Sequence, residues 1–271
     1  TQWVRLEFDN IPTFGQTGFF RITRKGHLVT RLYLVAEMPD IYSVQRSAKM
    51  ANGGSWAYPR FGWTNSLGHA LIQQLTMDIA ASRVETLDGQ LMELLDEFYT
   101  PMEKLSAVND GIKRKDSGFT EQSYGWASTD SPIGFKEKVV VPLPFWFSRG
   151  DMGCALPIDA MGVDEVRCGV TFRNLNGLYY TSTQQVIGAG SDGTEGAGLY
   201  PLLGSSFYSL NPITNPNQTG LIGVNGPIKM PTSLSLGECY IMAEYVYLDQ
   251  NEANRFRLAD LEVPVVQHLS L

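Results

Sequence analysis

The chain has 271 residues, enough to bury a large core in one large β domain or two small ones. Its composition, with 43% hydrophobic and 18% charged residues, excludes a disordered chain. The net charge is −7 and no basic run is longer than Lys113-Arg114-Lys115, which argues against direct binding to nucleic acid. No apolar run approaches the ~20 residues that a membrane-spanning helix needs.

The first predicted elements are two strands, over residues 14–24 and 28–38. The 27 glycines, 14 prolines and 13 phenylalanines of the chain are typical of a loop-rich β protein. Apolar residues alternate at Leu32, Leu34 and Ala36. Because Gly26 lies between the two segments, the pattern predicts a hairpin with a tight turn there. A further strand is predicted over residues 70–80.

One amphipathic helix is predicted over residues 89–99. Leu91, Leu94, Leu95 and Phe98 recur at helical spacing, and Pro101 marks the end of the helix. Residues 103–134 are polar and rich in Lys, Asp, Ser and Gly, so we expect a long surface loop there.

Residues 138–147 read as a strand with an unusual feature. Pro142 and Pro144 cannot donate hydrogen bonds to a neighbouring strand, which predicts an edge strand or a bulged strand. Residues 155–158 and 165–172 supply two further predicted strands.

The segment 174–235 is dominated by Gly, Ser, Thr, Asn and Pro, and we expect an outer loop that contains short strands. A clear strand pattern returns at residues 238–248. About eight strands with one short inserted helix and long loops predict an all-β, eight-stranded antiparallel sandwich, as a single domain over residues 1–271. The order of the strands cannot be derived from these patterns.

The sequence offers little for cofactor or metal chemistry. Residues 188–193 match the dinucleotide fingerprint Gly-x-Gly-x-x-Gly, but no strand pattern precedes them and no helix pattern follows them, so a flexible loop is favoured. His27, His69 and His268 are far apart and do not form the His/Glu cluster of a jelly-roll metal enzyme. We therefore expect no cofactor and no metal site.

Catalytic residue patterns are also missing. Glu93, Asp96 and Glu97 could be read as a general acid and base, but their helical context favours a solvated helix face. No Gly-x-Ser-x-Gly motif occurs, and no cysteine has a nearby histidine to activate it. The expectation is a protein without enzymatic activity.

The cysteines and one sequon bear on covalent modification. The odd number of cysteines, Cys154, Cys168 and Cys239, favours buried thiols in a reducing compartment over a disulfide framework. Asn217 begins the sequon Asn-Gln-Thr and is a weak candidate for glycosylation, which a reducing compartment would leave unmodified.

Five ordered blocks resemble the major capsid proteins of nucleocytoplasmic large DNA viruses, with iridovirus-like and ascovirus-like proteins the nearest. In chain order, the first three blocks cover residues 14–34, 65–72 and 91–101, and the last block covers residues 244–256. The most specific block carries the family-like signature Pro142, Pro144, Phe145, Trp146, Phe147 and Arg149, followed by Ala155, Leu156 and Pro157. Residues 181–235 match no part of the family that can be identified.

The resemblance implies the first of two jelly-roll domains of a longer capsid protein, with the second domain not present in this chain. It further implies a homotrimer that forms a pseudo-hexagonal capsomer of an icosahedral shell, in contact with neighbouring capsomers and minor capsid proteins. The expected location is the virion capsid, assembled in the host cytoplasm, with only indirect contact to an internal viral membrane.

The alternative function is a lectin-like jelly roll that binds carbohydrate. Its platform for sugars would be the aromatic residues Trp56, Tyr58, Trp63 and Trp126. The stretch Phe145-Trp146-Phe147 could also stack on sugars, although strand aromatics are more often core residues.

Overall fold

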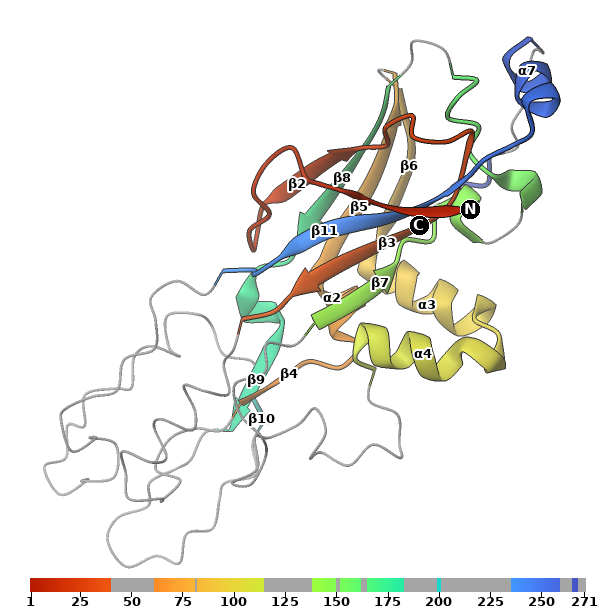
Figure 1. Ribbon diagram of the computed structural model, residues 1–271. Helices are drawn as coiled ribbons and strands as arrows, with labels where there is room; N and C mark the ends of the chain where they lie inside the picture. Colours follow the sequence, from red (N-terminus) through yellow and green to blue (C-terminus); the bar gives the residue numbers. More distant parts are fainter. Residues whose placement is uncertain are drawn as a thin grey trace, which may run out of the picture.

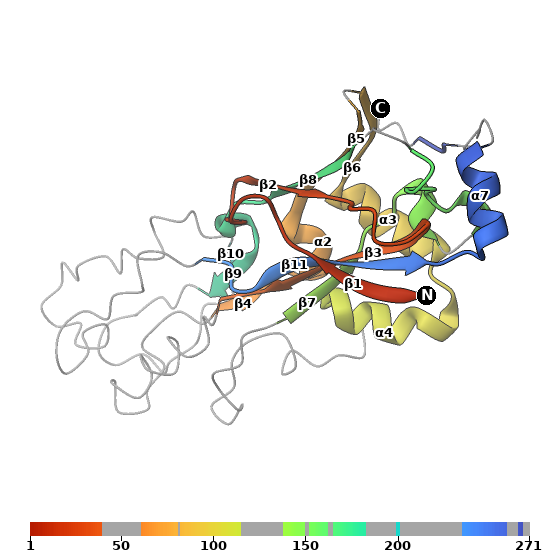
Figure 2. The same ribbon diagram turned by 45° about the horizontal axis from the view of Figure 1, so that its top comes forward.

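The computed structural model describes residues 1–39, 61–80, 82–114, 138–149, 152–161, 165–182, 199–200, 235–258 and 265–267. Two four-stranded antiparallel sheets pack against each other, as Figures 1 and 2 show. In sheet order, the first contains β1 (Gln2–Leu6), β11 (Cys239–Val246), β3 (Leu28–Glu37) and β7 (Lys138–Pro142). The second contains β2 (Thr17–Arg21), β8 (Val166–Phe172), β5 (Ile72–Ile79) and β6 (Ser82–Asp88). The predicted eight-stranded sandwich is confirmed.

The strand order is that of a jelly roll. If these eight strands are numbered along the chain, the sheets read 1-8-3-6 and 2-7-4-5, so consecutive strands repeatedly cross from one sheet to the other. This arrangement contains the two Greek keys of a jelly roll.

The core lies between the two sheets and follows the alternation of the strands. Leu32 and Leu34 of β3 are fully buried on the inner face, and so are Val139 of β7 and Ile241 of β11. Phe20, Val170 and Leu75 face them from the second sheet. One continuous cluster therefore joins both inner faces, as expected for a sandwich.

The predicted helix is confirmed as α3 (Gly89–Tyr99). It begins where the Asp88 side chain accepts a hydrogen bond from the Leu91 amide at 2.7 Å, which satisfies one free donor of the first turn. The prediction of a single helix is wrong, because the described residues also form the helices α2 (Leu67–Leu71), α4 (Met102–Ile112) and α7 (Gln250–Leu258).

Helix α4 corrects the prediction of a loop from residue 103 onward. Its composition is polar, but Leu105, Val108 and Ile112 follow helical spacing, and Ile112 is fully buried. The helix lies beside β7, where Gly111 comes so close that a Cβ atom there would lie 2.8 Å from the Val140 carbonyl oxygen. Residues 115–134 of the predicted loop lie outside the described part of the chain.

The predicted hairpin at Gly26 is wrong. β2 pairs with β8 and β3 pairs with β11 and β7, so the two strands belong to opposite sheets. The connection crosses the edge of the sandwich, where Gly26 packs against the Tyr245 ring. A short glycine-containing link between two strands therefore marks a crossing between the sheets.

Two other strand predictions are only partly correct. The strand at 138–147 ends at Pro142, and the chain then enters the 3₁₀ helix η1 (Trp146–Arg149). Residues 155–158 provide a single bridge between Leu156 and Val29 and no full strand.

Short strands do occur in the predicted outer loop, as β9 (Tyr179–Ser182) and β10 (Leu199–Tyr200), which form a small sheet with β4 (Phe61–Trp63). The remainder of residues 183–234, including Asn217 and the segment 188–193, lies outside the described residues. Among the helices that are described, none has the length and apolar character to cross a bilayer.

None of the three cysteines is in a disulfide, and the expectation of buried thiols holds for Cys168, whereas Cys154 and Cys239 are partly exposed. Burial raises the pKa of Cys239 to about 12 and raises the pKa of the fully buried Cys168 further still, whereas Cys154 in η2 (Met152–Cys154) is partly exposed. Because the thiolate is the reactive form, we expect a thiol reagent at about pH 8 to modify Cys154 alone in the native protein and all three cysteines in denaturant. Mass spectrometry of the labelled peptides would reveal this, and native labelling of Cys168 would contradict it.

Candidate functional site

The aromatic part of the predicted signature lies in the core. Phe145 and Phe147 are fully buried and stack with ring centroids 5.7 Å apart. Trp146 packs edge-on against Phe147 at 5.2 Å and is 3% exposed. The Trp146 backbone amide donates to the buried Glu85 carboxylate of β6 at 3.3 Å. These side chains therefore hold the segment after β7 against the second sheet and are not available to stack on sugars.

The other signature residues anchor the same region. Ala155, Leu156 and Pro157 are buried, and Leu156 exchanges backbone hydrogen bonds with Val29 at 2.9 and 3.0 Å. Arg149 ends η1, and its side chain lies outside the described part of the structure. That these residues form a family signature stays a prediction.

An ionic cluster joins α2, α3 and the end of α4. The Arg114 guanidinium lies 2.8 Å from Glu93, 2.9 Å from Asp96 and 3.5 Å from Glu97. Glu93 also contacts His69 Nδ1 at 2.5 Å and accepts a hydrogen bond from Ser66 at 2.8 Å. The predicted solvated face is therefore wrong for Asp96, whose side chain is 7% exposed, holds for Glu97, at 72%, and holds in part for Glu93, at 38%.

Arg114 reaches this cluster because of the way α4 ends. Lys113 adopts a left-handed conformation with φ 59°, and the Arg114 amide then donates to the Asn109 carbonyl oxygen at 2.9 Å. The Arg114 side chain turns back over α3 and donates to the Asn109 side chain at 3.1 Å. Sequence patterns missed the cluster because α4 itself was expected to be a loop.

The cluster has the character of a structural ion network. Its carboxylates are engaged by Arg114, His69 and Ser66. Within the described ranges, no group of three or more His, Cys, Asp and Glu side chains is placed to hold a metal ion.

Glu93 makes this cluster sensitive to pH. Burial alone would raise the pKa of Glu93, but hydrogen bonds from His69, Arg114 and Ser66 outweigh burial and lower it to about 2, against an ordinary value of 4.5. A lowered folded-state pKa contributes stability that is fully present above the unfolded pKa and is lost as the pH falls from 4.5 toward 2.

We expect about 1 kcal/mol of stability from this source, because the side chain is 38% exposed and water screens the interactions. Urea unfolding at about pH 6 and about pH 3 should therefore show a larger acid loss of stability in the wild type than in Glu93→Gln. Equal losses in the two proteins would contradict the assignment.

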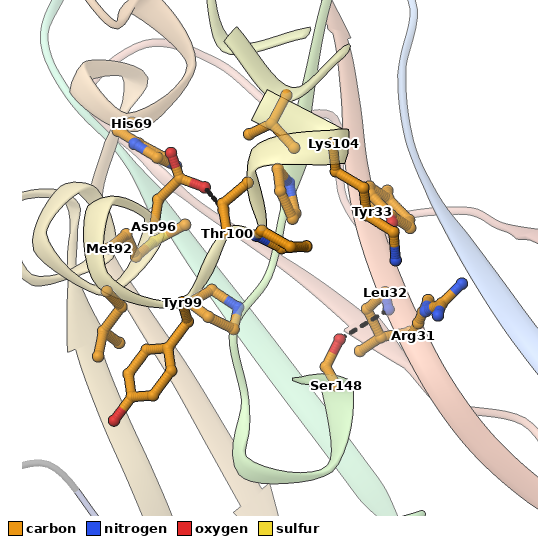
Figure 3. A pocket seen from close by; sticks show the side chains of 15 residues that line it. Arg31, Leu32, Tyr33, His69, Met92, Asp96, Tyr99, Thr100, Lys104 and Ser148 are labelled. Carbon is orange, nitrogen blue, oxygen red and sulfur yellow. Dashed lines mark hydrogen bonds between the residues drawn. The ribbon is translucent and has the colours of Figure 1, made fainter. Parts of the chain in front are cut away.

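A small cavity of about 170 Å³ lies between the first sheet and the helices (Figure 3). Tyr33, Pro144 and Ser148 line it from the sheet side, and Met92 and Tyr99 line it from α3. Ligand sites for small molecules and cofactors usually occupy about 300–1,000 Å³, so this cavity is small for such a role.

The platform expected for a lectin is not supported. Trp63 is 3% exposed and belongs to the core, which corrects its prediction as a sugar-binding residue. Trp56, Tyr58 and Trp126 lie outside the described ranges.

Comparison with known proteins points to one family. Residues 3–249 match the family model described as "Major capsid protein N-terminus". The chain is 25% identical over 172 residues to a protein named "Probable capsid protein 4" of Acanthamoeba polyphaga mimivirus, covering 64% of this chain and 30% of that protein. It is 26% identical over 208 residues to the major capsid protein of Tipula iridescent virus, covering 76% of this chain and 40% of that protein. The chain thus spans about a third of the length of these relatives.

The fold has a solved counterpart in VP54 of PBCV-1, from a crystal structure fitted into a reconstruction of the virophage Sputnik. The TM-score is 0.56 at 14% identity, over 95% of this chain and 44% of the other. The family match begins within β1 and extends past the end of β11, so it includes every strand of both four-stranded sheets. The chain therefore belongs to the family of the major capsid protein N-terminus.

Proposed function

We propose that this chain is the shell-forming N-terminal part of a major capsid protein, which acts by self-association and not by catalysis. The observation that carries the proposal is the family match over residues 3–249, because it covers the whole sandwich. The ionic cluster, whose carboxylates are engaged by Arg114, His69 and Ser66, supports a structural role. A rigid sandwich with long connections is also suited to repeated contacts between subunits.

The proposed assembly is a trimer that forms a pseudo-hexagonal capsomer. Residues 1–271 would form the first of two jelly rolls, and two sandwiches per polypeptide would place six similar corners around each trimer. Neighbouring capsomers and minor capsid proteins would be the partners in a virion assembled in the host cytoplasm, with internal membrane contacted only indirectly. The net charge of −7 supports a shell role without direct binding to nucleic acid.

The native mass of the purified full chain tests this proposal. Sedimentation equilibrium should yield the mass of a trimer, and electron microscopy of concentrated samples should show regular capsomers. A chain that remains monomeric at every concentration and forms no particles would contradict the proposed function.

A further inference from the structure

The two sheets present chemically different outer faces. On the outer face of the sheet β2-β8-β5-β6, the outward positions are mostly hydroxyl, amide or charged groups, among them Thr17, Gln74, Asp78, Thr86 and Thr171. The outward Phe19 lies beneath the Arg167 guanidinium, 4.0 Å from its centre. This pattern is usual for an antiparallel sheet with one side in water.

The outer face of the sheet β1-β11-β3-β7 instead combines aromatic and aliphatic side chains with charged ones. The apolar outward positions in register across its four strands include Trp3, Tyr33, Val140, Tyr240 and Met242, with Val35 buried among them at 5% exposure. Trp3 is 44% exposed and Val140 is 36% exposed. Figure 1 shows no labelled helix lying across this face. A sheet face of this composition is typical of a surface that becomes covered.

Charges on this face are balanced, although the whole chain carries −7. Glu238 is paired with Arg5 at 2.5 Å and with Lys138 at 3.8 Å, and Glu244 lies 3.7 Å from Arg31. The Arg5 guanidinium also stacks over the Tyr240 ring at 4.0 Å. Because its carboxylates are paired, two negatively charged copies can approach here with little repulsion.

The apolar face continues onto the helices. The cavity described above joins Tyr33 and Pro142 on the sheet to Tyr99 and Pro101 at the end of α3 (Figure 3). Tyr99 is 65% exposed, and the neighbouring Phe98 and Met102 are 74% and 86% exposed. A sheet face four strands wide and about six residues long covers roughly 400 Å². Since each side of a standard protein interface buries about 800 Å², the helical extension supplies area that the sheet alone lacks.

We infer that the outer face of β1-β11-β3-β7, extended by Tyr99 and Met102, is the surface on which a second copy of this chain docks. The inference rests on the proposed function, since a shell built from one polypeptide must offer each copy an apolar surface that a like-charged copy can approach. It assigns the contact between copies to a sheet face.

The test is the self-association of the full chain, measured by sedimentation velocity over a concentration series. Trp3→Glu and Val140→Glu each add a carboxylate at an exposed outward position of an edge strand of this face. Thr86→Glu is the matched control, because it adds the same charge to the exposed outer side of the edge strand β6. We expect the first two variants to weaken association roughly 30-fold or more and the control to change it by less than about 3-fold. Circular dichroism should show that all three variants fold.

The outcomes separate this inference from the proposed function. Wild-type association that Trp3→Glu and Val140→Glu leave unchanged, or that Thr86→Glu weakens equally, would overturn the inference and leave the capsid role intact. A folded monomer in which hydroxyl-radical footprinting finds Trp3 and Tyr33 protected would also overturn it, because another part of the same chain would then cover the face. A wild type that never self-associates would contradict the proposed function as well.

Discussion

Replacing Phe147 by alanine is expected to lower the free energy of unfolding by about 3–5 kcal/mol. Phe147 is fully buried, stacks with Phe145 and packs edge-on against Trp146, so truncation removes a ring from the centre of the core. The loss combines the transfer free energy of the ring, its aromatic contacts and the cavity left behind. Since a domain is stabilised by about 5–15 kcal/mol in total, the variant should unfold at a much lower urea concentration.

Phe98→Ala is the matched control for this prediction. It removes the same ring from α3 at a position that is 74% exposed, so we expect a change within about 0.5 kcal/mol. If the two variants lost equal stability, the predicted signature would have no special place in the core. A loss of stability by Phe147→Ala alone would establish that the aromatic stretch acts through packing.

Elements with a strong local pattern could be predicted from the sequence. Helix α3 begins and ends at the residues expected, because its apolar spacing and Pro101 agree in the sequence. The alternating strands β3, β8 and β11 were also found, since each buries one full side. These patterns depend only on neighbouring residues, so the elements can be predicted without knowledge of the fold.

Other elements depend on contacts with distant parts of the chain. β6 was not predicted, because Glu85 points into the core and breaks the usual apolar alternation. The pairing of β2 with β8 brings together residues about 150 positions apart, such as Thr17 and Thr171. A local hairpin was the simpler reading of the same residues, and only the packing of two sheets excludes it.

The ionic cluster escaped prediction for the same reason. In the sequence, Glu93 and Asp96 have the pattern of solvated helix residues. Only the fold shows that Arg114, which follows α4, pairs with both of them. The apolar outer face of the first sheet also required the structure, because outward and inward positions are distinguished only once the strand register is known.

Arg114→Ala should destabilise the sandwich by about 3–5 kcal/mol, because it leaves the Asp96 and Glu93 carboxylates without the cation that they share. The Arg114 side chain is 8% exposed, so water cannot replace the guanidinium without opening the contact between α3 and α4. Arg83→Ala is the control, since it removes an arginine paired with Asp78 at a side chain that is 55% exposed, and it should cost less than about 1 kcal/mol.

Urea unfolding at about pH 7 measures both variants, and the double variant Arg114→Ala/Asp96→Ala adds a decisive comparison. Removing Asp96 together with Arg114 takes away one of the two charges left behind, so the double variant should recover part of the stability that Arg114→Ala loses. If the two losses simply added, Arg114 would contribute through the packing of its side-chain stem, and the buried ion pair would have no role in holding α4 against α3.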